Sequence, residues 1–167
     1  IRQIKLIDKD KIGIFYYNKS ILTIVENVID FPNRKTTDLN KHKGTINCFD
    51  VSKNKKIMAT GSDDKTVLLW NTLDYTSNVL KHEFEVNYLS FSTDSSLTVS
   101  VSKNSLNLWS TENLNLLKSF PNIASTIGIS LTNSILLIPT TKNSLILIDI
   151  SSYNIIDEKT EDVTIEC

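Results

Sequence analysis

Apolar residues along this chain occur in short, β-branched runs that are separated by polar turns. The turns recur about every 8 to 12 residues, a spacing typical of all-β proteins. Nowhere do apolar residues recur at positions i, i+3, i+4 and i+7 for long enough to predict a helix. The pattern therefore predicts an all-β fold built from many short strands.

One strand-like phrase recurs at a fixed distance. TVLLWN, which contains Trp70, returns 39 residues later as SLNLWS around Trp109. Another 39 residues on, SLILID repeats it with Ile148 in the tryptophan position. A fixed period near 40 residues is typical of an array in which each unit is one small supersecondary module.

Each unit of this array is expected to contribute four strands, and the chain is expected to form one partial domain over residues 1–167. In the first unit, Val28–Phe31 is the expected fourth strand and Pro32–Asn40 is expected to be a polar connector. The expected units are residues 2–40, 42–81, 82–120 and 122–160, with the first strand of a further unit at 162–167.

Residues 42–71 contain HKGTINCFDVS and then MATGSDDKTVLLWN, which resemble a complete WD40 repeat. Residues 82–115 resemble the same repeat well, and 122–156 and 2–31 resemble it in their strand pattern. The resemblance implies four-stranded antiparallel blades of a β-propeller. About four blades are present, whereas rings of this family usually have seven. We therefore expect an open arc whose remaining blades come from further chain or from another subunit, because its end blades would otherwise expose apolar faces and strand edges.

The resemblance also implies a buried, hydrogen-bonded chain of four side chains at His42, Thr60, Asp64 and Trp70. A buried carboxylate needs donors, and imidazole and hydroxyl groups supply them. The first three residues also combine a base, a hydroxyl and a carboxylate, as catalytic triads do. They match a pattern that braces a blade, so we interpret them as structural and predict no enzyme.

The second unit keeps part of this set, at His82, Ser100 and Trp109. Lys103 or Asn104 stands where the aspartate is expected. The third unit keeps only the strand pattern, and blade formation there is expected to depend on its apolar strands.

Composition argues against nucleic-acid binding and a membrane-spanning helix. The net charge is -1, Arg2 and Arg34 are the two arginines, and the lysines are scattered, so a dedicated nucleic-acid surface is not expected. No run approaches the ~18 apolar residues of a spanning helix, and the start at Ile1 is neither a signal nor a transit peptide, which suggests an internal start.

No cofactor or metal is expected either. Cys48 and Cys167 fit neither a metal spacing nor a disulfide framework. A reduced, buried Cys48 favours an intracellular location, cytoplasmic or nuclear. The pair Asp63 and Asp64 is explained by a turn without a cation, and the four glycines form no phosphate-binding loop.

Without an enzymatic constellation, function is expected to come from rim loops. The resemblance implies a non-catalytic platform of eukaryotic cells that holds several protein partners. Phe84, between two glutamates, is expected to be an exposed aromatic residue suited to a protein contact. Alternatively, each of these positions is only a solvated turn residue. The candidate partner-binding residues are Lys43, Gly44, Thr45, Asp63 and Lys65 in one unit and Glu83, Phe84, Glu85 and Lys103 in the next.

Two other classes of function stay open. Some similar propellers bind phosphoinositides through a paired-arginine motif, and no Arg-Arg pair occurs in this chain. A propeller subunit of an RNA or ribosome assembly particle is a further alternative, held there by protein contacts. On the opposite rim, Lys53, Lys55 and Lys56 form a basic turn that could meet an acidic partner or simply be solvated.

Overall fold

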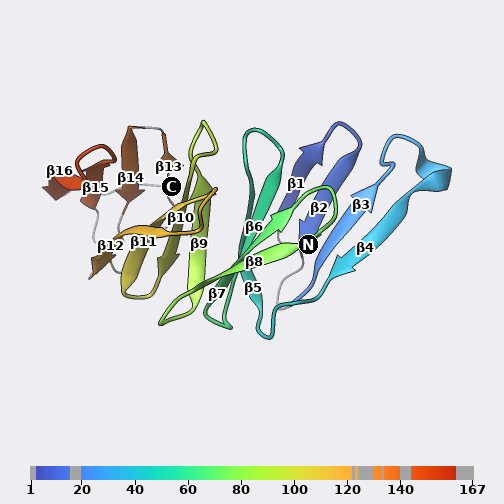
Figure 1. The fold of residues 1–167 in the computed structure, drawn as a ribbon, viewed down its shortest axis with the longest axis horizontal. Coiled ribbons are helices and arrows are strands. Elements are labelled where there is room, and N and C mark those ends of the chain that lie inside the picture. The colour runs from blue at the N-terminus through green and yellow to red at the C-terminus, as the bar shows by residue number, and fades with distance from the viewer. Residues whose placement is uncertain are drawn as a thin grey trace.

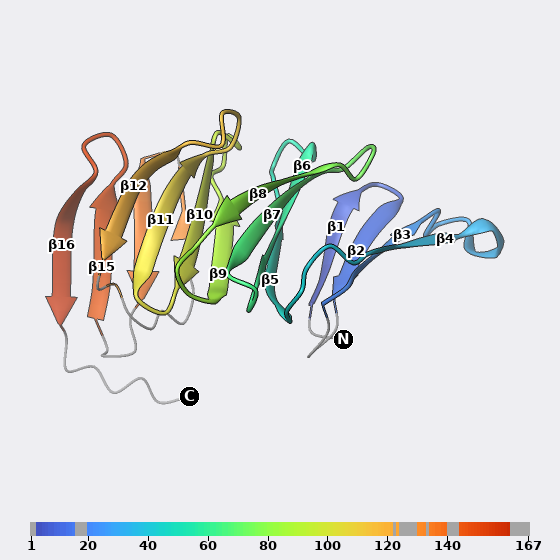
Figure 2. The same ribbon diagram turned by 60° about the horizontal axis from the view of Figure 1, so that its bottom comes forward.

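The structure is a computed structural model that describes residues 3–15, 20–121, 123, 130–132, 134–139 and 144–160. Within these residues, sixteen strands form four antiparallel sheets of four strands each. The sheets stand side by side in chain order, with the first strands of neighbouring sheets adjacent (Figures 1 and 2). The expected all-β architecture of four-stranded antiparallel blades is confirmed.

Every sheet uses four consecutive strands, each paired with the next one along the chain. The first sheet contains β1 (Gln3–Asp8), β2 (Lys11–Phe15), β3 (Leu22–Glu26) and β4 (Lys35–Leu39). The second contains β5 (Ile46–Val51), β6 (Ile57–Ser62), β7 (Thr66–Asn71) and β8 (Ser77–Lys81). The third contains β9 (Val86–Phe91), β10 (Leu97–Ser102), β11 (Ser105–Ser110) and β12 (Leu116–Pro121). The fourth contains β13 (Ser130–Leu131), β14 (Ile135–Pro139), β15 (Ser144–Asp149) and β16 (Asn154–Thr160).

The hydrophobic core lies between the sheets, in three layers. Ile7 and Ile24 of the first sheet pack with Met58 and Trp70 of the second. A second layer joins the second and third sheets around Leu69, and a third joins the third and fourth sheets. Because a layer forms only where two sheets meet, each sheet needs a neighbour to bury an apolar face.

Burial along the strands separates the middle of the arc from its ends. In the middle sheets, β6, β7, β10 and β11 bury at least four successive residues each, so both of their faces are covered. In the fourth sheet burial alternates: Leu136 and Ile138 are fully buried, whereas Ile135 is 36% exposed. In the first sheet the corresponding outward residues, Ile4 and Leu6, are 52% and 55% exposed.

The repeat is also visible in the backbone. Tyr75, Leu114 and Tyr153 all have a positive φ, between 54° and 63°, just before the fourth strand of their sheets. These residues are spaced 39 positions apart. A left-handed conformation is uncommon for residues with large side chains, so its recurrence shows that the fourth sheet keeps the geometry of the repeat where its sequence has lost the tryptophan.

One expectation about the strands was wrong. The fourth strand of the first sheet is β4, Lys35–Leu39, and not Val28–Phe31. Residues 28–30 form a bend, the 3-10 turn η1 (Phe31–Asn33) with Pro32 near its start follows them, and Ile29 is 78% exposed. An outermost strand needs few buried side chains, and β4 buries only Leu39. The expected further strand at 162–167 lies outside the described residues.

Candidate functional site: a braced rim

His42 lies at the centre of a hydrogen-bonded chain that links four side chains of the second sheet. Its Nδ1 is 2.8 Å from Oδ2 of Asp64, and its Nε2 is 2.7 Å from Oγ1 of Thr60. The indole N–H of Trp70 donates to the same hydroxyl at 2.9 Å. The structure thus brings together the four residues that the WD40 resemblance implied.

The carboxylate of Asp64 is held by several donors besides the imidazole. The backbone N–H of Lys43 donates to Oδ2 at 2.8 Å, and the backbone N–H and hydroxyl of Thr66 both donate to Oδ1. Burial alone would raise the pKa of Asp64, but these hydrogen bonds lower it overall. Since Asp64 is ionised at neutral pH, it ties the loop before β5 to the turn before β7.

Burial lowers the pKa of His42, and the Asp64 carboxylate opposes only part of that effect. The imidazole is therefore neutral at pH 7. Its side chain is fully buried. A neutral ring without solvent access, between fixed partners, suits a brace rather than a base that exchanges protons with a substrate.

The third sheet repeats the brace with a different partner. His82 Nε2 lies 2.8 Å from the Ser100 hydroxyl, which also accepts a hydrogen bond of 2.8 Å from the Trp109 indole. On the other side of the ring, the amide nitrogen of Asn107 lies 3.4 Å from His82 Nδ1. Burial lowers the pKa of His82 to about 4.

Asn107, rather than Lys103 or Asn104, thus occupies the place opposite Nδ1. Its side-chain oxygen accepts a hydrogen bond of 2.7 Å from Ser119 on β12. Sequence comparison missed it because it lies on strand β11, whereas Asp64 lies in a turn. The sequence did contain a feature that could have identified Asn107: its amide side chain stands between Leu106 and Leu108, and a polar residue in a buried apolar strand needs hydrogen-bond partners.

Three of the candidate rim loops lie together, on what we call the histidine rim: the loops around residues 43–45, 63–65 and 82–85. The backbone N–H of Asp63 donates to the Thr45 carbonyl at 3.0 Å, and that of His82 donates to the Lys65 carbonyl at 2.9 Å. Asn47, which sequence reasoning had not singled out, donates to both the Asp63 carboxylate and the Val86 carbonyl.

Charged side chains of both signs project from this rim. Thr45 and Gly44 are half-buried between the loops. Phe84, expected to be exposed, is also half-buried, so it offers part of its ring rather than a fully exposed aromatic face. The exposed candidates are Lys43, Asp63, Lys65, Glu83, Glu85 and Lys103.

Metal and membrane features were searched over the described part of the chain. No group of three His, Cys, Asp or Glu side chains there is close enough to hold a metal ion. Likewise, none of its helices has the length and apolar character required to cross a membrane.

Comparison with known proteins locates one repeat in the sequence. The family model "WD domain, G-beta repeat" matches residues 33–71. Transducin beta-like protein 2 of Mus musculus is 49% identical to this chain over 37 residues, and its Homo sapiens counterpart is 46% identical over 37 residues. These segments cover 22% of this chain and 8% of each relative.

The fold of most of the arc also has a counterpart. The solved structure of U3-55K superposes with a TM-score of 0.69 at 14% sequence identity, over 74% of this chain and 41% of that one. At this identity the likeness concerns the fold. Residues 33–71 thus match a WD40 repeat, and the four sheets of the arc share their fold with that structure.

Proposed function

We propose that this chain is a non-catalytic scaffold that binds partner proteins through its histidine rim. WD40 proteins are generally protein-interaction scaffolds. The observation that carries the proposal is that buried hydrogen bonds fix the loops of this rim, while their charged side chains of both signs stay exposed. His42 and Asp64 hold the loops from below, while Lys43 and Lys65 remain in solvent.

This arrangement supplies what a binding platform needs. Loop residues that are already ordered lose less conformational entropy on binding than mobile ones. Charges of both signs lie at Lys43, Asp63, Lys65, Glu83 and Glu85, and they favour recognition of several partners by complementary charge rather than of one uniformly acidic or basic ligand.

We further propose that additional blades, from further chain or from another subunit, cover the two end sheets. The outward face of the first sheet carries Ile4, Leu6, Ile12, Ile14 and Val25 on paired positions of three strands. The outward face of the fourth sheet carries Ile135 and Leu145, at 36% and 38% exposure. Exposed apolar sheet faces of this kind are typical of interfaces.

Affinity purification of the full-length protein, followed by mass spectrometry, tests the scaffold function. A variant that combines Lys43→Glu, Lys65→Glu, Glu83→Lys and Glu85→Lys keeps the net charge and should lose partners that the unaltered protein recovers. Lys53→Glu on the opposite rim is the control and should retain them. Partner recovery that is unaffected by the four changes would contradict the proposal.

The two alternative classes are tested by separate binding experiments. Flotation of the protein with phosphoinositide-containing liposomes, weakened by salt, would instead support a membrane-surface role. Retention on RNA that falls steeply with salt would support direct RNA binding. We expect neither, because the loops of the histidine rim carry three exposed carboxylates, at Asp63, Glu83 and Glu85, and two exposed lysines, Lys43 and Lys65.

A further inference from the structure

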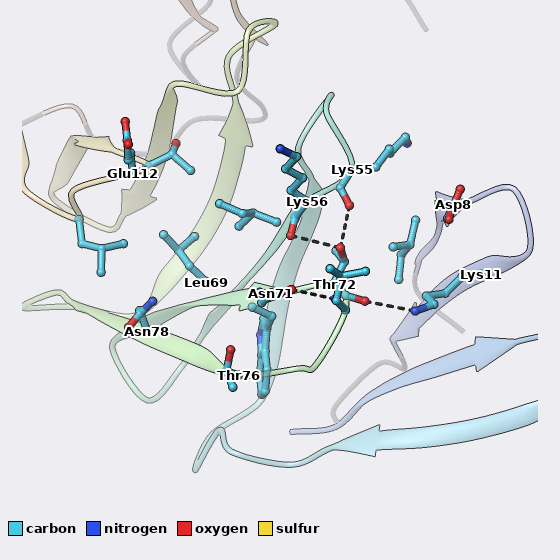
Figure 3. A pocket seen from close by; sticks show the side chains of 16 residues that line it. Asp8, Lys11, Lys55, Lys56, Leu69, Asn71, Thr72, Thr76, Asn78 and Glu112 are labelled. Atoms are coloured by element: carbon cyan, nitrogen blue, oxygen red, sulfur yellow. Dashed lines mark hydrogen bonds between the residues drawn. The ribbon is translucent and has the colours of Figure 1, made fainter.

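A groove of about 740 Å³ runs around the end of the second sheet, on the rim opposite the histidine rim (Figure 3). Its walls come from three sheets. One end is formed by the turn after β1 and by Lys11. The middle is formed by the turn around Lys55 and Lys56 and by the loop after β7. The other end is formed by Thr111, Glu112 and Leu114 of the third sheet.

Part of the floor is apolar: Leu69 is buried there, and Ile57 and Leu114 are half-buried against it. Ile57, Leu69 and Leu114 line it between the second and third sheets, and Leu73 lies at its edge with 86% of its surface exposed. The loop that carries Leu73 is well anchored: Thr72 donates its hydroxyl to the Lys55 carbonyl at 2.8 Å, and its N–H to the Lys56 carbonyl. A fixed leucine in solvent beside an apolar floor is suited to covering an inserted side chain.

The charges around the floor are arranged unevenly. Lys11 is neutralised by Glu26 at 2.8 Å, and its ammonium also donates to the Thr72 carbonyl. Lys55 and Lys56 have no carboxylate within ion-pair distance among the residues that the structure describes. Glu112 lines the groove from the third sheet. A carboxylate on a ligand would therefore be favoured beside Lys56 and disfavoured beside Glu112.

We propose that this groove binds an extended peptide segment of a partner protein, with an apolar side chain over Ile57, Leu69 and Leu114 and an acidic side chain against Lys56. An open groove that crosses three sheets fits an extended chain. Glu112 and Asp8 among the lining residues disfavour a polyanion such as RNA or an anionic membrane. The site is separate from the histidine rim and does not depend on the function proposed there.

The probe is a fluorescein-labelled heptapeptide with one leucine followed by two aspartates, flanked by glycine and serine. Its binding to the full-length protein is measured by fluorescence anisotropy and by NMR shifts of the Leu73 and Leu114 amides. Lys56→Glu should weaken binding by about tenfold and favour a peptide with lysines in place of the aspartates. Leu73→Ala should weaken both peptides.

Two controls are matched to these changes. Lys53→Glu makes the same charge change in the same turn but outside the groove lining, and Val79→Ala removes another exposed apolar side chain, and both should leave the affinity unchanged. Lys43→Glu should also have no effect, which separates this site from the histidine rim. Failure of the peptide to bind, equal loss with Lys53→Glu, or tighter binding to RNA or to anionic vesicles would overturn the proposal.

Discussion

The side-chain amide of Asn107 faces His82 from the side on which a carboxylate faces the histidine of the preceding sheet. The distance from Nδ2 of Asn107 to Nδ1 of His82 is 3.4 Å, and that from Oδ2 of Asp64 to Nδ1 of His42 is 2.8 Å. An ionised carboxylate only accepts hydrogen bonds, whereas an amide nitrogen only donates them. In the two sheets, the imidazole Nδ1 therefore has opposite roles: it donates a hydrogen bond in His42 and accepts one in His82.

The two histidines should consequently occupy opposite neutral tautomers. His42 must carry its proton on Nδ1 to donate to Asp64, and His82 must carry it on Nε2 so that Nδ1 can accept from Asn107. Long-range proton–nitrogen NMR spectra of the imidazoles at pH 7 would distinguish the two forms. The same tautomer in both rings would contradict the assignment.

Asn107→Asp should convert the second brace into a form like the first. The change is nearly isosteric and leaves an oxygen to accept from Ser119, but it puts a negative charge beside His82. We expect the pKa of His82 to rise clearly above its present value of about 4, because a nearby carboxylate favours the imidazolium. An NMR titration measures the shift.

Asn107→Ala serves as the control for that titration. It removes the amide without adding a charge and should leave the pKa of His82 low. A similar rise in both variants would mean that solvent entry, not the carboxylate, caused it.

Stability should fall as the pH drops from 7 toward 4. Unfolded histidines take up a proton near pH 6.5, whereas His82 in the folded protein resists protonation until about pH 4. The unfolded state therefore binds more protons in this window, and protonation favours unfolding. For His82 alone the loss between pH 7 and 4 is about 3 kcal/mol, with His42 acting in the same direction.

Urea titrations at several pH values, followed by tryptophan fluorescence, measure this slope. His82→Gln should flatten it between pH 6.5 and 4. Below about pH 4 a separate loss should appear in both proteins as Asp64, whose pKa is lowered in the folded state, becomes protonated. An equal slope in the variant above pH 4 would count against the role of His82.

Thr60→Val should destabilise the protein more than its size change suggests. The fully buried hydroxyl serves both Trp70 and His42, and its loss leaves two buried polar groups without a partner. We expect a loss of about 2 kcal/mol or more in unfolding free energy. Thr60→Ser keeps the hydroxyl and should lose much less in the same denaturation assay.

Gly61→Ala should loosen the contact between the second and third sheets. An added Cβ would lie 2.5 Å from the Cys48 sulfur and 2.6 Å from Cγ1 of Val86, so overpacking should cost about 1–3 kcal/mol. Cys48→Ala in the same chain should restore part of the stability, as thermal unfolding would show. Gly44→Ala is the contrast: its Cβ would meet the backbone nitrogen of Asp64 at 2.7 Å, which no side-chain truncation nearby can relieve.

The sequence predicted the candidate site best where its residues resemble a known repeat. His42, Thr60, Asp64 and Trp70 could be placed together because residues 42–71 resemble a WD40 repeat, and the resemblance implies a hydrogen-bonded chain at these positions. Asn107 could not, because its role depends on which face of β11 meets His82, and that is a matter of strand register. Similarly, β4 was missed because hydrophobicity predicts buried strands well, whereas an outermost strand is defined by pairing and can be polar.

The half-buried position of Phe84 has a related cause. The loop after β8 is held against the second sheet by the hydrogen bond from His82 to Lys65. This contact joins residues from two repeats, so a prediction made for each repeat separately does not include it.

The one-sided burial of the first and fourth sheets has a consequence for dynamics. In an array where each unit is stabilised by its neighbours, a unit with one neighbour opens at a lower free-energy cost than a unit with two. Amide protons of β6 and β10 should therefore exchange last in this arc, and opening should spread from both ends toward Trp70 and Trp109. Any blade or subunit that docks on an end sheet would slow amide exchange in that sheet first and in the middle sheets afterwards. The exchange protection of each end sheet would then show whether a neighbour is bound to it.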